Sequence, residues 1–200
     1  MTEAGNTTSE HMVLSFLQAE IDSKSKFGLD YLAILNANHI DRSLVDQADL
    51  SNPDENRLRA RLLTSKRGYL SRTALFLGFP ASAGWRIVEI DISEYSILRH
   101  LKDPEWIEMS SSIRLVTETV RSVREGRVDN IHSRNINAVA ERIRRGDTFP
   151  ELIVVQRKTT DDLIVLEGNT RAAAYAVADY ESTIRLVVGT SEDMDQWHWY

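Results

Sequence analysis

The sequence contains no cysteine, and that absence excludes several kinds of site. Disulfide bonds, thiolate zinc sites, iron–sulfur clusters and cysteine nucleophiles all need this side chain. Long apolar runs are also absent, since runs such as residues 31–35 fall far short of the roughly 20 residues that span a bilayer. We therefore expect no membrane segment. The first residues also lack the basic and apolar regions of a signal peptide, so we expect a cytoplasmic protein.

Two catalytic patterns are missing as well. No G-x-S-x-G motif occurs, so nothing supports a hydrolase triad built on a nucleophilic serine. The five histidines form no H-x-x-x-H or similar pair, so we expect no metal site made by the protein alone. They are His11, His39, His100, His132 and His198.

The composition is that of an ordinary globular chain of 200 residues, 42% hydrophobic and 27% charged, which suits one domain with an extension. The net charge of −6 argues against a general nucleic-acid coat, because Lys and Arg drive phosphate binding. Two segments are nevertheless basic: residues 53–72 hold six bases against two acids, and residues 114–145 hold eight arginines against four acids. These are either Arg-rich helices that contact nucleic acid or, as we favour, helix faces whose charges pair among themselves.

The first part of the chain is predicted to be mostly helical. We expect residues 1–10 to form a disordered tail. The segment 78–84, with two glycines and a proline, is the clearest break in the sequence, so residues 11–84 are predicted to form a helical N-terminal region. Its apolar residues have helical spacing in 12–20, 29–38 and 56–64.

Residues 85–200 are predicted to form a second unit that mixes strands and helices, with an insert at about 93–135. The fold class is therefore α+β. The expected elements are a strand at 85–92, helices at 113–123 and 136–145, strands at 152–155 and 163–166 that form a hairpin, a helix from about 171 to 178, and a last strand at 184–188.

The stretch from Leu163 to Tyr175 is the one pattern that carries chemistry. It passes from an apolar strand through Gly168 into an alanine-rich helix, whose first amides have no intrahelical acceptor and lie at the positive end of the helix dipole. We expect Asn169 or Thr170 to cap this helix. Arg171 is a cation in a first turn that favours acids, so either a bound anion or a carboxylate such as Glu167 balances its charge.

Residues 136–188 resemble the ParB/sulfiredoxin-like superfamily. Members carry a helix that ends in glycine, a Phe-Pro-x-x-Val-Val strand, a second strand, and a Gly-x-x-Arg box that opens a helix of small residues. Here these parts are residues 138–146, Phe149-Pro150-Glu151-Leu152-Ile153-Val154-Val155, residues 163–166, and Gly168-Asn169-Thr170-Arg171 followed by Ala172-Ala173-Ala174. The strand at 87–92 is similar to the first strand of the family. The resemblance implies a mixed sheet with flanking helices.

The resemblance also implies a nucleotide site. In the family the box holds the phosphates of ATP or CTP, usually with magnesium, so Gly168, Asn169, Thr170 and Arg171 would bind a nucleoside triphosphate. Arg134 lies where members often have basic residues near the phosphates. Asn169 replaces the catalytic cysteine of sulfiredoxins, which excludes sulfinic-acid reduction. The chain also ends soon after the last predicted strand, without the DNA-binding helix-turn-helix of partition proteins, so we do not expect a complete partition protein.

Phosphoryl transfer also needs a carboxylate, to hold magnesium or to accept a proton. Glu167, next to the box, is the candidate catalytic residue. Glu89, Asp91 and Glu94 lie on or just after the first predicted strand, where Glu89 and Asp91 are more simply the solvent-facing side of an edge strand. We therefore expect a nucleotide-binding protein that acts as an NTPase or phosphotransferase. The alternative is a non-catalytic ParB-like module associated with nucleic acid. We keep a second copy of the chain, in a homodimer, as a further candidate partner.

Overall fold

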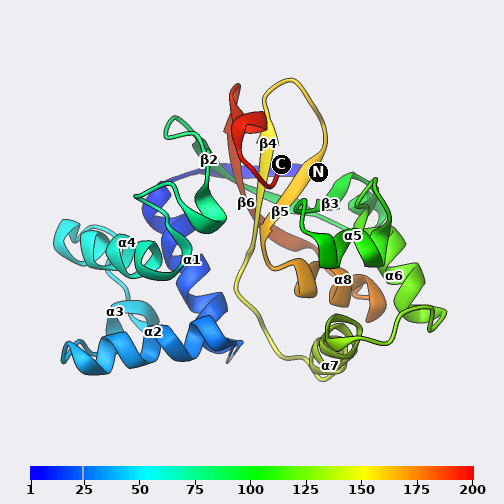
Figure 1. The fold of residues 1–200 in the computed structure, drawn as a ribbon, viewed down its shortest axis with the longest axis horizontal. Coiled ribbons are helices and arrows are strands. Elements are labelled where there is room, and N and C mark those ends of the chain that lie inside the picture. The colour runs from blue at the N-terminus through cyan, green and yellow to red at the C-terminus, as the bar shows by residue number, and fades with distance from the viewer. Residues whose placement is uncertain (24) are drawn as a thin grey trace.

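A six-stranded mixed sheet runs through the middle of the molecule in the order β1-β2-β6-β4-β5-β3 (Figure 1). The computed structural model describes residues 1–23 and 25–200. The pairs β4–β6 and β3–β5 are parallel and the other neighbours are antiparallel. The strands are β1 (Thr2–Thr7), β2 (Gly84–Ile90), β3 (Leu98–His100), β4 (Leu152–Arg157), β5 (Leu163–Glu167) and β6 (Ile184–Ser191).

Helices flank this sheet in two groups: in Figure 1, α1–α4 lie on the left and α5–α8 on the right. This confirms the predicted α+β class, a mixed sheet with flanking helices. The α-helices are α1 (Ser9–Asp22), α2 (Lys26–Ala37), α3 (Ser43–Asp46), α4 (Pro53–Arg67), α5 (Pro104–Ser110), α6 (Val116–Arg124), α7 (Ile131–Arg144) and α8 (Asn169–Val177). Three short 3-10 helices are η1 (Ala74–Phe76), η2 (Ile92–Ile97) and η3 (Met194–Gln196).

The first residues form a strand, where a disordered tail was predicted. Residues 2–7 pair with β2 at the edge of the sheet, in a register that joins Thr7 to Trp85. Their side chains are exposed or nearly so, so backbone hydrogen bonds rather than apolar burial hold the strand in place. Along the chain, the helical region therefore begins after β1 and ends before β2, and these two strands are neighbours in the sheet.

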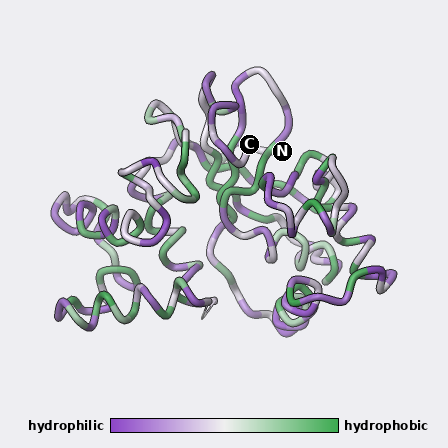
Figure 2. The backbone as a smooth tube through the Cα atoms, in the orientation of Figure 1, coloured by the Kyte–Doolittle hydropathy of each residue, from purple (hydrophilic) through white to green (hydrophobic). Residues whose placement is uncertain are grey.

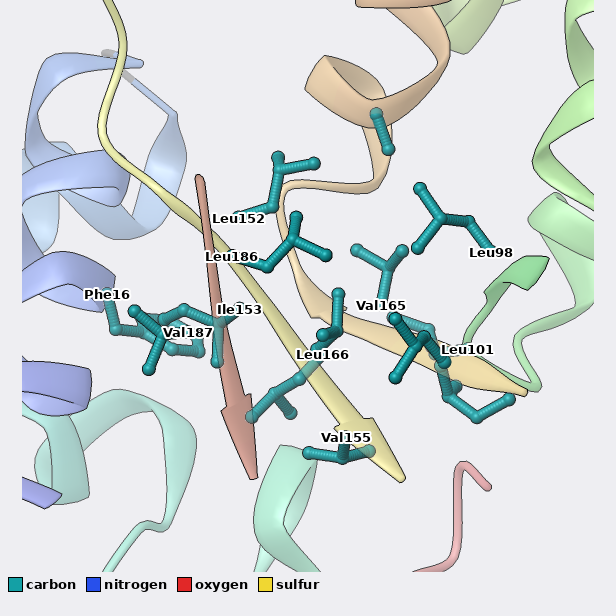
Figure 3. Packing of buried hydrophobic residues seen from close by; sticks show 14 of the residues in the cluster. Phe16, Leu98, Leu101, Leu152, Ile153, Val155, Val165, Leu166, Leu186 and Val187 are labelled. Atoms are coloured by element: carbon teal, nitrogen blue, oxygen red, sulfur yellow. The ribbon is translucent and has the colours of Figure 1, made fainter. Parts of the chain in front are cut away.

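The core follows from apolar strands that are buried on both faces. Leu152 pairs with Leu186 and Ile153 with Val187, and all four side chains are fully buried. In Figure 3, Ile153 and Val187 lie toward Phe16 of α1, whereas Leu152 and Leu186 lie on the other side. Figure 2 shows the same concentration of hydrophobic residues along the central strands. Such uninterrupted apolar runs are typical of strands that are covered by helices on both sides.

The segment 93–135, predicted as an insert, is part of this fold. It supplies the edge strand β3, which pairs in parallel with β5, and the helices α5 and α6. The hairpin of β4 and β5 and the final strand β6 are confirmed at almost the predicted positions. The insert therefore forms one end of the sheet and brings new side chains beside the Gly168 turn.

The aromatic C-terminus folds back onto the molecule. Trp197 is 1% exposed, packs edge-on against Phe79, and donates its indole N–H to the carbonyl of Leu75 at 2.7 Å. This contact fixes the end of the chain against the segment that links α4 to β2.

None of the helices in residues 1–23 and 25–200 combines the length and apolar composition needed to cross a membrane.

Candidate functional site

A cleft of about 1140 Å³ lies between the N-terminal helices and the part of the molecule that carries α7 and the start of α8. One wall comes from α1, the start of α2 and the end of α4. The opposite wall comes from α5, α7 and residues 148–150. The loop between β5 and α8 lies between them, so Glu167, Gly168, Asn169, Thr170 and Arg171 all line the cleft. The structure thus places the whole predicted box at one cavity.

Gly168 makes the turn from β5 into α8 possible. It is the N-cap residue and adopts φ +96°, a left-handed conformation that favours glycine. A Cβ at this position would lie 2.6 Å from a methyl carbon of Leu152, so the close packing of strand and helix also requires glycine. No side chain caps α8, contrary to the prediction for Asn169 or Thr170. The first intrahelical bond runs from the Ala172 amide to the Gly168 carbonyl at 2.8 Å, so the amides that precede Ala172 have no acceptor within the helix.

The Asn169 side chain is directed into the protein rather than toward a ligand. Its Nδ2 donates to the carbonyl of Val165 at 3.1 Å, and its Oδ1 lies 2.9 Å from Nδ1 of His100. Because Oδ1 accepts, the His100 ring must carry its proton on Nδ1. His100 is fully buried, and burial lowers its pKa to about 4, so the ring is neutral at pH 7. Asn169 therefore fixes the turn through its side chain and offers a ligand only its backbone amide.

Arg171 is paired with a carboxylate, which was the simpler of the two sequence interpretations. Its Nη2 contacts Glu167, four residues earlier, and its Nη1 donates to the carbonyl of Pro150. Burial raises the pKa of Glu167, while the guanidinium of Arg171 acts in the opposite direction. The pair is close to neutral as a unit, so an anion at this turn must share Arg171 with Glu167.

The wall formed by the N-terminal helices carries a second buried ion pair, which the sequence analysis did not identify. Glu20 of α1 is 5% exposed and pairs with Arg67 at the end of α4. The Arg67 guanidinium carbon lies 3.6 Å from the centre of the Phe27 ring. Glu20 also accepts a hydrogen bond from the Ser25 hydroxyl at 2.7 Å. This pair lines the same cleft as Glu167 and Arg171.

A histidine and a tryptophan from the predicted insert and α7 form the opposite part of the cleft. Trp106 of α5 stacks on His100 with 4.3 Å between ring centres, and its other neighbour is His132, at 4.9 Å. Nε2 of His132 lies 2.5 Å from a carboxylate oxygen of Glu105. Trp106 and His132 line the cleft, whereas His100 is fully buried.

Other predicted residues lie elsewhere. Arg134 is on the exposed part of the first turn of α7, 3.8 Å from Asp129, and is not among the residues that line the cleft. The side chains of Asp91 and Glu94 form the capping box of η2, which accounts for both carboxylates. Glu89 lies on β2, opposite Arg185 of β6. Of the sequence candidates, the box and Glu167 are brought together, and Arg134 is separate from them.

The two basic segments carry most of their charge in ion pairs. These pairs join residues one turn apart or on neighbouring elements, so the positive charge available to nucleic acid is much smaller than the sequence count implies. The interpretation of these arginines as internally paired is therefore the one the structure favours. The pairs are Arg57–Asp54, Arg59–Glu55, Lys66–Asp30, Arg67–Glu20, Arg121–Glu118, Arg124–Asp179, Arg127–Glu125, Arg134–Asp129, Arg142–Asp147 and Arg144–Glu141.

Charged side chains of both signs line the cleft. Among the described residues, five carboxylates and three arginines line it, which leaves an excess of negative charge. In the described part of the chain, no group of three or more His, Asp or Glu side chains is placed to hold a metal ion.

Sequence reasoning missed His100, Glu20 and Arg67 because each acts across a long separation in the chain. His100 and Asn169 are 69 residues apart, and Glu20 and Arg67 are 47 apart. The available signals were weak: a lone histidine beside a short apolar stretch, and two charges within amphipathic helices. Comparison with known proteins adds no site assignment, since no family model, curated protein or solved structure matches this chain.

Proposed function

We propose that this chain is a nucleotide-binding protein of the ParB/sulfiredoxin-like kind, whose cleft takes ATP or CTP with magnesium. The observation that carries the proposal is the uncapped first turn of α8, which opens into a large cleft beside Thr170 and Arg171. Backbone amides at a helix N-terminus, together with the helix dipole, favour a phosphate group. The resemblance of the box to the family's phosphate-binding motif supports the same conclusion.

Each residue of the turn would contribute to phosphate binding in a different way. The amides of Asn169, Thr170 and Arg171 would donate to phosphate oxygens, while Gly168 lets the backbone approach the ligand without a Cβ. The Arg171 guanidinium is held in position by its hydrogen bond to the Pro150 carbonyl. It would donate a charge-assisted hydrogen bond to the phosphate while it remains paired with Glu167. The base would lie beside His132 and the part of Trp106 that lines the cleft.

An NTPase or phosphotransferase activity would use the carboxylates of the same cleft. Glu167 would hold magnesium against the phosphates or accept a proton from the attacking hydroxyl, since its buried position raises its pKa. Magnesium would neutralise charge on the transferred phosphoryl group. Arg171 positions Glu167 in this scheme.

Thermal unfolding with a panel of nucleotides tests the proposal. Millimolar ATP, CTP and GTP, each with magnesium, are added to the wild type, Thr170→Glu and Thr170→Gln. A ligand at one hundred times its dissociation constant adds about 2.7 kcal/mol to the stability of the folded state. We expect one nucleotide to raise the Tm of the wild type and of Thr170→Gln, and not of Thr170→Glu, whose added carboxylate repels the phosphate. If no nucleotide raises the Tm of the wild type, the proposal is refuted.

A further inference from the structure

Arg67 reaches the cleft from a part of the chain outside the ParB-like unit. It is the last residue of α4, in the helical region whose contribution to function the sequence left open. It lines the same cleft as Thr170 and Arg171, on the opposite wall. We propose that Arg67 is the second cation of the nucleotide site and binds the distal phosphates, so that the cleft selects di- and triphosphates over monophosphates. This inference rests on the proposed nucleotide function.

The position of Arg67 is fixed before any ligand binds. Its guanidinium carbon lies 3.6 Å from the centre of the Phe27 ring and 5.9 Å from that of Phe16. A planar guanidinium on an aromatic face keeps its N–H groups directed sideways, and little side-chain entropy is lost when they donate. Among the described residues, Glu20 is the only hydrogen-bond partner of this guanidinium. Its Nε is buried and makes no hydrogen bond within that part of the chain.

Two of the three arginines that line the cleft, Arg67 and Arg171, are each paired with a buried carboxylate. Arg171 is paired with Glu167 and Arg67 with Glu20, and Glu20 and Arg67 are both close enough to influence the Glu167 carboxyl. Each arginine is thus held in place by one buried carboxylate with which a phosphate would compete. A monophosphate at the α8 turn can engage only the Arg171 side. A chain of two or three phosphates can extend from that turn toward Arg67.

The competition gives opposite predictions for the two partners of the Arg67 pair. Replacing Glu20 by glutamine removes a competing negative charge, so Arg67 is freer to bind phosphate and the triphosphate binds more tightly. Replacing Arg67 as well removes the cation and leaves no unpaired charge in the interior. If the pair serves only to join α1 to α4, neither replacement alters the preference for triphosphate.

Calorimetric titration measures this preference as the ratio of monophosphate to triphosphate dissociation constants. The nucleotide is the one that stabilises the wild type, and the variants are Glu20→Gln, the double variant Glu20→Gln/Arg67→Met, and Arg61→Met as an exposed control on α4. We expect the ratio to rise in Glu20→Gln, to fall about ten-fold or more in the double variant, and to stay constant in the control. Monophosphate affinity should be the same in all four proteins.

The outcomes separate the two proposals. If the wild type binds no nucleotide, the proposed function fails and this inference fails with it. If the wild type binds a triphosphate and the double variant keeps the same ratio, Arg67 is a structural residue and only this inference is overturned. A parallel loss of monophosphate and triphosphate affinity in the double variant would also overturn it, since that result shows a distorted cleft. Circular dichroism on each variant confirms that the helices are retained.

Discussion

The buried His100 ring should make the protein markedly less stable in mild acid. In the folded state His100 donates from Nδ1 to Asn169, and its Nε2 is buried without a hydrogen-bond partner in the described structure. Protonation would place a positive charge and an unsatisfied N–H at Nε2. Arg114 and His132 nearby also disfavour that charge, although burial is the larger cause. The folded pKa of about 4 is therefore far below the value of about 6.5 expected in the unfolded chain.

The sign and size of the effect follow from this difference. Between pH 6.5 and pH 4 the unfolded chain binds a proton at His100 and the folded protein does not, so stability falls as the pH falls through this window. Each unit of pKa difference corresponds to about 1.4 kcal/mol. Between pH 7 and pH 4.5, His100 alone should thus lower the free energy of unfolding by roughly 2–3 kcal/mol.

Urea denaturation at pH 7 and pH 4.5 provides the measurement. His100→Gln cannot titrate, and it retains an amide donor for Asn169. It should be less stable than the wild type at pH 7, because the ring stacked on Trp106 is lost, yet it should lose about 2–3 kcal/mol less on acidification. His198→Gln, at an exposed position, should behave as the wild type does. An equal acid-induced loss in the wild type and His100→Gln would refute the reasoning.

Two further predictions concern the turn itself. In urea denaturation, Gly168→Ala should destabilise the protein by about 2 kcal/mol or more, because its Cβ would clash with Leu152 and the alanine would also have to adopt a left-handed φ. Gly126→Ala is the control: its φ is also left-handed, but nothing lies within 4 Å of its new Cβ, so it should cost only about 1 kcal/mol. Arg171→Met should cost about 3–5 kcal/mol at pH 7, because it leaves Glu167 buried without its cation. Since burial raises the pKa of Glu167, the stability lost in Arg171→Met should shrink as the pH falls and the carboxyl is protonated. The double variant Glu167→Gln/Arg171→Met should regain part of the lost stability. A loss of stability that does not depend on pH would contradict the buried Glu167–Arg171 ion pair.

The elements that could be predicted from sequence are those whose burial leaves a pattern. β4 and β5 read as strands because residues 152–155 and 163–166 are uninterrupted apolar runs, and both strands are buried in the core. β1 could not be found this way, since all but one of its side chains are exposed and an edge strand needs only backbone partners. The predicted boundaries missed it because they rested on side chains alone.

The candidate site was predictable where it is local and not where it is assembled by the fold. The turn at Gly168 is a short sequence pattern, and the pairing of Arg171 with Glu167 follows from their four-residue spacing on the turn that opens α8. His100 contacts Asn169 only because β3 lies beside β5, and Arg67 lines the cleft only because α4 ends on the wall opposite the Gly168 turn. No spacing in the sequence encodes those contacts.

Calorimetric titration of ATP and CTP with magnesium into the wild type, Thr170→Gln and Thr170→Glu tests the central claim most directly. The glutamate adds favourable charge at the start of α8, worth about 0.3–1 kcal/mol, so the variant should fold at least as well as the glutamine control. The account predicts saturable binding of one nucleotide to the wild type and to Thr170→Gln, and a loss of about ten-fold or more in Thr170→Glu. Binding of equal strength to all three proteins, or no binding to the wild type, would contradict it.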